Sequence, residues 1–118
     1  MPDNAFKIFS GTIPNGTKIS GEIVLDEVYY PAMIKYPAMT TSVALNFEVM
    51  FTADEGSDGS YVELKGSDGT AYALTIVAGA AGVIALDPTI FYCIKRLKVK
   101  VADNQTGDKA INIIGRQY

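Results

Sequence analysis

Large apolar side chains at every second position of residues 43–51 constrain the fold of this chain more than any other feature of its sequence. Successive side chains of an extended strand point to opposite faces, so a period of two predicts a strand with one face buried. The same period recurs in residues 71–76 and 96–101. The side chains predicted to face inward are Val43, Leu45, Phe47, Val49, Phe51, Tyr72, Leu74, Ile76, Leu97, Val99 and Val101. These segments therefore predict half-buried β-strands.

Weaker strand candidates lie at residues 6–9, 18–25, 28–35, 61–65, 82–86 and 110–114, and no segment has helical periodicity. Turns that are rich in glycine, aspartate and asparagine separate them. About eight to nine short strands at this spacing predict an all-β fold, an antiparallel β-sandwich of jelly-roll-like form. The 118 residues suit a single domain that spans residues 1–118, in which residues 1–11 could extend as an N-terminal arm.

One helical turn is expected at residues 87–91, because Asp87 can cap the free amides and Pro88 suits the first helical position. Cys93 follows in the apolar run of residues 90–94, which predicts that its thiol is buried. Because it is the single cysteine, no intramolecular disulfide can form.

The segment Tyr29–Met39 is apolar, poor in charge and interrupted by proline. Proline cannot donate a backbone hydrogen bond, so an edge strand or a broad loop is predicted here rather than a central strand. A monomer would rarely expose such a segment, so it either covers the end of the sandwich or docks on a partner. Its predicted contact residues are Tyr29, Tyr30, Pro31, Met33, Tyr36, Pro37 and Met39.

The charged residues are unevenly distributed along the chain, which has a net charge of −3. This charge argues against a nucleic-acid partner, since dedicated nucleic-acid binders usually carry a concentrated positive face. Acids dominate residues 48–87, whereas Lys95, Arg96, Lys98 and Lys100 fall close together. We expect these four basic residues mostly on one exposed strand face. There they are either simply solvated, or they complete the predicted interface by steering copies of the protein together.

The chain contains no histidine, which removes the imidazole that serves as base or ligand in many serine, cysteine and zinc sites. Paired carboxylates remain, but no tryptophan is present to line a sugar-binding groove. Residues Asp54–Gly59 match a calcium loop only in part, since Gly56 and Lys65 occupy two of its ligand positions. An acidic hairpin turn is favoured there, with calcium left open. We expect no catalytic residue, no cofactor and no metal site.

Targeting and membrane signals are missing from the sequence. The first residues carry no basic charge and lead into no long apolar run, so no secretory signal is expected. The longest uncharged apolar stretch, residues 71–86, is too short and too interrupted by glycine to span a bilayer. These features predict synthesis in a cytoplasm and no membrane role.

An ordered series of short motifs runs from Ser20 to the end of the chain. The motifs are Ile23-Val24-Leu25, Met33–Thr40, Val43–Phe47 followed by an acidic glycine turn, Ser67–Thr70, Ala85–Pro88 with Phe91, Leu97–Val99, Asn104-Gln105 and Ile111–Arg116. In this order they resemble a family of small tailed-phage virion proteins encoded near the major capsid protein. Members of this family are described as cement, decoration or head-fibre proteins.

The resemblance implies a non-enzymatic virion structural protein that binds the outer capsid surface and cements neighbouring major capsid proteins. It implies a location in the virion after assembly in the host cytoplasm, and a homo-oligomer, a trimer or a dimer, since symmetric lattice positions favour symmetric binders. A phage fibre or host-surface glycan-binding module is the alternative, and an isolated ligand-binding or enzymatic β domain is a third hypothesis. Exposed aromatic residues in a groove would favour glycan binding. A flat proline-rich arm with complementary charge would favour cementing.

Overall fold

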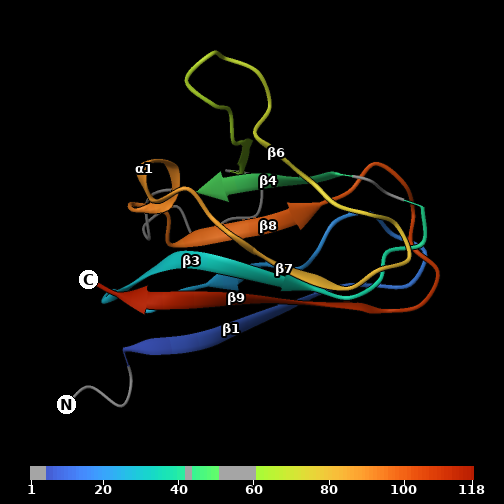
Figure 1. Ribbon diagram of the computed structural model, residues 1–118, viewed down its shortest axis with the longest axis horizontal. Coiled ribbons are helices and arrows are strands. Elements are labelled where there is room, and N and C mark those ends of the chain that lie inside the picture. The colour runs from blue at the N-terminus through green and yellow to red at the C-terminus, as the bar shows by residue number, and fades with distance from the viewer. Residues whose placement is uncertain (1–4, 42–43, 51–60) are drawn as a thin grey trace.

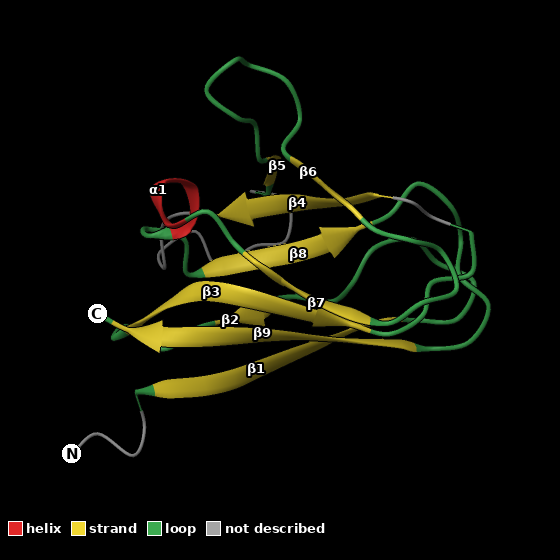
Figure 2. Ribbon diagram, in the orientation of Figure 1, coloured by secondary structure: helices red, strands yellow, loops and turns green. Residues whose placement is uncertain are grey.

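The computed structural model describes residues 5–41, 44–50 and 61–118, which form two antiparallel β-sheets packed face to face (Figure 1, Figure 2). The elements in chain order are β1 (Phe6–Ile13), β2 (Ile23–Val24), β3 (Tyr29–Tyr36), β4 (Ala44–Met50), β5 (Val62–Glu63), β6 (Ala73–Thr75), β7 (Gly82–Ala85), α1 (Pro88–Phe91), β8 (Arg96–Lys100) and β9 (Lys109–Gln117). The prediction of an all-β antiparallel sandwich is confirmed.

The four-stranded sheet has the strand order β1-β9-β3-β7, so the first and last strands of the chain are neighbours. β1 pairs with β9 in an unbroken antiparallel register, from Phe6 opposite Arg116 to Ile13 opposite Lys109. The prediction that residues 1–11 extend as an arm is therefore wrong for residues 6–11, which belong to the sheet. Residues 1–4 lie outside the described part of the chain.

The five-stranded sheet has the order β2-β8-β4-β5, and β6 also pairs with β4. Alternation directs Leu45, Phe47 and Val49 of β4 inward, where all three are buried. Leu97 and Val99 of β8 lie opposite Val49 and Phe47 and are buried as well. The period-two pattern thus assigned the inward faces of these two strands correctly, and the core lies between the sheets.

β3 contains Pro31 yet lies between β9 and β7, so the prediction of an edge strand or a loop is wrong. The Tyr118 amide donates to the Val28 carbonyl, which makes residues 28 and 30 the hydrogen-bonding positions toward β9. The Pro31 nitrogen therefore faces the β7 side. Pairing with β7 begins only at Met33, beyond a shift in the register with β9. The proline thus removes no ladder bond from this strand.

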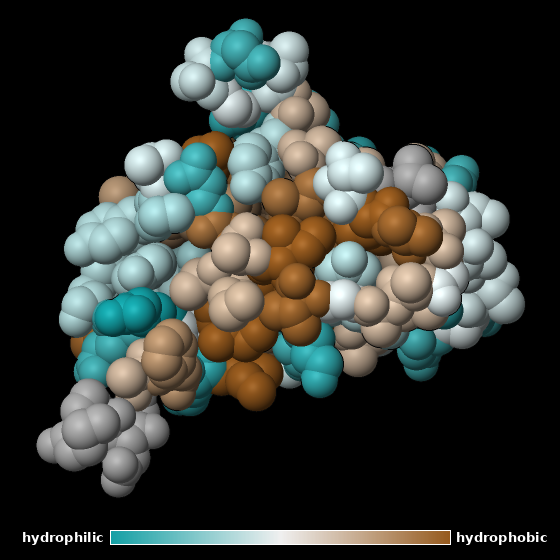
Figure 3. All heavy atoms as spheres, viewed as in Figure 1, coloured by the Kyte–Doolittle hydropathy of each residue, from teal (hydrophilic) through white to brown (hydrophobic). Residues whose placement is uncertain are grey.

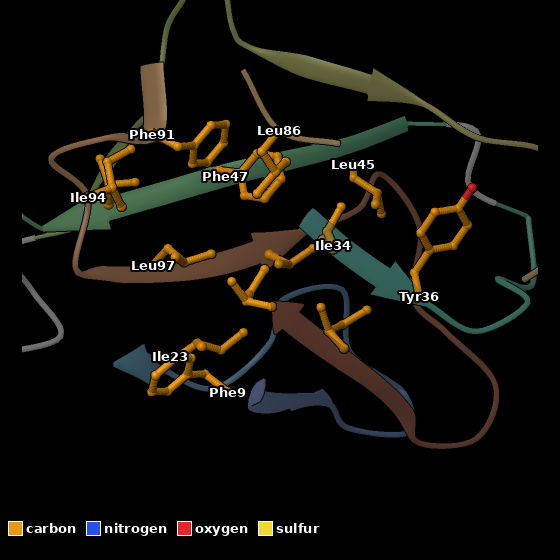
Figure 4. Packing of buried hydrophobic residues seen from close by; sticks show 14 of the residues in the cluster. Phe9, Ile23, Ile34, Tyr36, Leu45, Phe47, Leu86, Phe91, Ile94 and Leu97 are labelled. Carbon is orange, nitrogen blue, oxygen red and sulfur yellow. The ribbon is translucent and has the colours of Figure 1, made fainter. Parts of the chain in front are cut away.

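The short helix α1 is a single turn, as the sequence predicts. Asp87 caps the turn by accepting a hydrogen bond from the Thr89 amide at 2.9 Å, and Pro88 occupies its first position. The turn directs Phe91 into the core, where its ring meets that of Phe47 edge to face with the centroids 5.2 Å apart (Figure 4). Such aromatic pairs contribute stabilisation beyond their buried area. α1 therefore contributes one large buried side chain, Phe91, to the core.

The thiol of Cys93 is exposed, so the prediction that it is buried is wrong. The chain leaves α1 through a turn that buries Phe91 and Ile94 and exposes Tyr92 and Cys93 between them. The direction of each side chain in a turn depends on local dihedral angles, so an apolar run alone did not show which members are buried.

Candidate interaction surface

Much of the segment Tyr29–Met39 is buried by the rest of the chain. The buried members of the predicted contact set are Tyr29, Pro31, Tyr36 and Met39. The predicted interface is therefore wrong for these four residues. The alternative, that the segment covers the end of the sandwich, is wrong as well, because most of the segment is the inner strand β3 of the four-stranded sheet. Met33 is exposed, and Tyr30 and Pro37 are partly exposed. These three remain available on the surface.

An apolar row crosses the outer face of the four-stranded sheet, perpendicular to its strands. The register aligns one outward side chain from each strand, and we define the apolar row as Ile8, Ile114, Met33 and Ala85. Ile8 is 63% exposed and Met33 is 37% exposed. Figure 3 shows hydrophobic side chains gathered over β3, β7 and β9. The sequence did not show this row, because its members come from four strands whose pairing is not local.

Polar and basic residues flank the apolar row on the same face. On one side, Arg116 lies opposite Phe6, with its guanidinium carbon 5.5 Å from the centroid of the Phe6 ring. On the other side, the Ser10 hydroxyl donates a hydrogen bond to the Asn112 side chain at 2.7 Å, and Lys35 lies opposite Asn112. The outward positions of these four described strands carry the two basic residues Arg116 and Lys35 and no acid. The charge of this face is therefore positive.

Three of the four clustered basic residues, Arg96, Lys98 and Lys100, share the outward face of β8. Acidic side chains of neighbouring segments lie close to two of them. Arg96 Nη1 lies 3.5 Å from Glu22 Oε2, and Lys100 Nζ lies 3.8 Å from Glu48 Oε2. Partly exposed surface ion pairs of this kind contribute at most about 1 kcal/mol. The hypothesis of a solvated strand face is supported, because the surface has mixed charge.

Lys95 is separate from that face and contacts the C-terminal residue. Its ammonium donates hydrogen bonds to the backbone carbonyl of Glu27 at 3.0 Å, to that of Tyr29, and to the phenolic oxygen of Tyr118 at 2.7 Å. It also lies 4.0 Å from the centroid of the Tyr118 ring, within the cation–π range. Burial lowers the pKa of Lys95 and raises the pKa of Tyr118, because both groups are partly withdrawn from water.

The tyrosine cluster consists of Tyr30, Tyr92 and Tyr118, whose ring centroids lie 4.7–5.1 Å apart. Tyr92 and Tyr118 are each half-exposed. The hydroxyl of Tyr118 donates to the Tyr92 carbonyl, and its amide donates to the Val28 carbonyl, so the C-terminal residue is anchored. No sequence pattern marks this cluster, since its members come from β3, the turn after α1 and the chain end.

No group of three or more metal-ligating side chains comes together within residues 5–41, 44–50 and 61–118. The acidic segment Asp54–Gly59, for which the sequence leaves calcium open, lies outside those ranges. In the same ranges no helix is long and apolar enough to cross a membrane.

Comparison of the chain with known protein families and with curated protein sequences gives no match. The resemblance to phage cement proteins therefore rests on the sequence motifs alone. The structure defines the protein as an all-β sandwich that bears an exposed apolar row and an exposed tyrosine cluster.

Proposed function

We propose that this chain is a non-enzymatic virion structural protein that binds the outer capsid surface and cements neighbouring major capsid proteins. The apolar row is the observation that carries this proposal, since it offers exposed apolar side chains on the outer face of a sheet. The motifs that resemble phage cement and decoration proteins support the setting, which is the capsid surface of a virion assembled in the host cytoplasm.

Two physical properties make the apolar row suitable for docking on another protein. Contiguous exposed apolar side chains on a soluble protein mark interaction sites. The side chains also project from hydrogen-bonded strands, so the face is preorganised and loses little conformational entropy on binding. Arg116 and Lys35 beside the row would complement acidic side chains of the capsid protein and fix the orientation of docking. Many such contacts on one shell add up to strong attachment.

Met33→Glu tests this face directly. We expect the purified variant to bind expanded capsids that lack the protein about tenfold more weakly or worse. The new carboxylate would have to leave water when the apolar row docks, which is costly without a partner. Because Met33 projects outward, the fold should persist. Co-sedimentation with capsids measures occupancy, and the heat stability of the decorated capsid gives a second readout.

Val77→Glu is the matched control. It makes the same charge change at a valine that is 71% exposed and lies between β6 and β7, outside the four-stranded sheet. This variant should bind capsids as the wild type does. Equal occupancy by the Met33→Glu and Val77→Glu proteins would show that the apolar row is not the contact face. A wild-type chain that binds no capsid would contradict cementing itself.

The tyrosine cluster favours a second candidate function, a phage fibre or host-surface glycan-binding module. An exposed tyrosine offers an apolar ring face and a polar tip, both of which a sugar can contact. If this function holds, Tyr92→Ala should abolish the chemical-shift changes that host-surface oligosaccharides cause in the wild-type protein. Phe6→Ala, which alters an exposed aromatic residue outside the cluster, should preserve them. A wild-type protein that gives no shifts would count against glycan binding.

A further inference from the structure

β1 is the outermost strand of the four-stranded sheet (Figure 1). The Gln117 amide donates to the Ala5 carbonyl, so alternate residues from Ala5 onward bond toward β9. The backbone groups of residues 6, 8, 10 and 12 therefore point away from the sheet. The Thr12 carbonyl indeed accepts a hydrogen bond from the Gly21 amide at 3.1 Å on this outer side. The end of this edge at Thr12 is therefore already hydrogen-bonded within the chain.

The remaining residues of this edge are Phe6, Ile8 and Ser10, which have no backbone partner on the outer side within the described part of the chain. Proteins usually protect an open edge with proline, a bulge or a free charge, because it pairs readily with other strands. β1 contains no proline, and its register with β9 has no bulge. Its one charged residue, Lys7, lies 2.6 Å from Asp26 in an ion pair. The edge is therefore open to pairing.

The other sheet edges offer less backbone to a partner strand. β7, at the opposite edge of the same sheet, has four residues, and β2 and β5 have two residues each. An added strand would therefore form the longest ladder beside β1.

We propose that β1 pairs in antiparallel orientation with β1 of a second copy of this chain, about a twofold axis through Ile8. The pairing joins two four-stranded sheets into one continuous sheet. Twofold symmetry presents the same strand to itself, so each donor meets an acceptor. Ile8 pairs with its counterpart, and Phe6 pairs with Ser10 in both directions. This register satisfies every open backbone group of the edge.

The side chains agree with the same register. Ile8 lies beside Ile8 of the second copy, so the apolar row continues from one copy into the other. Phe6, which is 55% exposed, lies beside Ser10 of the second copy. Lys7 lies beside Phe9 of the second copy, so no two like charges oppose each other across the strands. The contact is isologous and closes after two copies, which gives a dimer rather than a fibre.

This pairing selects the dimer from the two oligomers that the resemblance implies. It stands independently of the capsid proposal, because its tests use the purified chain without capsids. A failure of either proposal therefore leaves the other intact.

Sedimentation analysis of the purified full chain gives the first test. The wild type should be a dimer, and Ile8→Lys should be a monomer, because two ammonium groups would face each other at the twofold axis. Val83→Lys is the matched control, since it introduces the same charge on the same face but on β7, at the opposite edge of the sheet. It should remain a dimer. Circular dichroism should show that both variants are folded. A monomeric or trimeric wild type would overturn the proposal.

Cross-linking gives a second test that does not depend on disrupting the edge. In a Cys93→Ser background, Ile8→Cys should form a disulfide-linked dimer under mild oxidation, because directly paired residues have Cα atoms about 5.5 Å apart, within the disulfide range. Thr12→Cys on the same strand should not cross-link, since the twofold axis moves its two copies far apart. A Thr12→Cys dimer that forms as readily as the Ile8→Cys dimer would overturn the register.

Discussion

Replacing Phe47 by alanine should lower the free energy of unfolding by about 3–5 kcal/mol. The Phe47 side chain is 0% exposed, and its ring centroid lies 5.2 Å from that of Phe91 and 6.0 Å from that of Tyr72. Alanine would leave a cavity among these rings. The strands around the cavity are fixed by ladder hydrogen bonds, so the core can collapse only in part. Urea denaturation followed by circular dichroism measures the loss.

Phe6→Ala is the matched control, because it removes the same ring from an exposed position on β1. At protein concentrations low enough for a monomer, it should change the free energy of unfolding by no more than about 0.5 kcal/mol. Comparable losses in the two variants would mean that the core is not centred on Phe47.

The fold was predictable where one strand alone carries enough information. In β4, alternation identified Leu45, Phe47 and Val49 as inward residues, and the same rule identified Leu97 and Val99 in β8. The helical turn was predictable for a similar reason, because its cap and its proline lie next to each other in the sequence. Local patterns of this kind depend on backbone geometry and not on the partner strand.

The errors arose where pairing between distant segments decides the outcome. Pro31 disfavours a central strand only if its nitrogen must donate to a neighbour, and the register of β3 avoids that need. The register also buries Tyr36, which the sequence assigned to a contact surface. Residues 6–11 lack a strong strand pattern of their own and are held by β9, which lies at the other end of the sequence.

The candidate surfaces were the least predictable part of the molecule. The apolar row can be recognised only when the register of four strands is known. In the sequence, single members such as Ile8 or Ile114 are ordinary strand residues. The basic residues were visible as a cluster, but the ion pairs of Arg96 with Glu22 and of Lys100 with Glu48 depend on contacts between segments that are distant in the sequence. The sequence therefore predicted a binding surface and assigned part of it to residues that the fold buries.

The two proposals have a physical connection. A dimer through β1 would place two apolar rows end to end on one continuous sheet, so one docking event could engage both copies. Bivalent attachment of this kind strengthens binding without any additional type of contact, provided that both rows face the capsid. If both proposals hold, the Ile8→Lys monomer should occupy capsids less well than the Val83→Lys dimer for two reasons, because it lacks the second copy and because Ile8 itself belongs to the apolar row.

Gln105→Ala should lower the free energy of unfolding by about 1–3 kcal/mol, the range for a buried polar group that loses its partner. Gln105 is 2% exposed. Its Oε1 accepts a hydrogen bond from the Thr40 amide at 2.8 Å, and its Nε2 donates to the Asp103 carbonyl at 2.8 Å. Its own amide donates to the Thr17 carbonyl at 2.8 Å. The residue therefore joins the connections between β1 and β2, β3 and β4, and β8 and β9.

Gln105→Met separates hydrogen bonding from packing, because methionine keeps the length of the side chain but lacks both polar atoms. It should be destabilised nearly as much as Gln105→Ala. In both variants the Thr40 amide should exchange with solvent about tenfold faster or more, since its acceptor is gone. Gln117→Ala, at the end of β9, should leave that exchange rate unchanged. If Gln105→Met matches the wild type in stability and in Thr40 protection, packing alone explains the burial of Gln105, and its hydrogen bonds do not hold the three connections together.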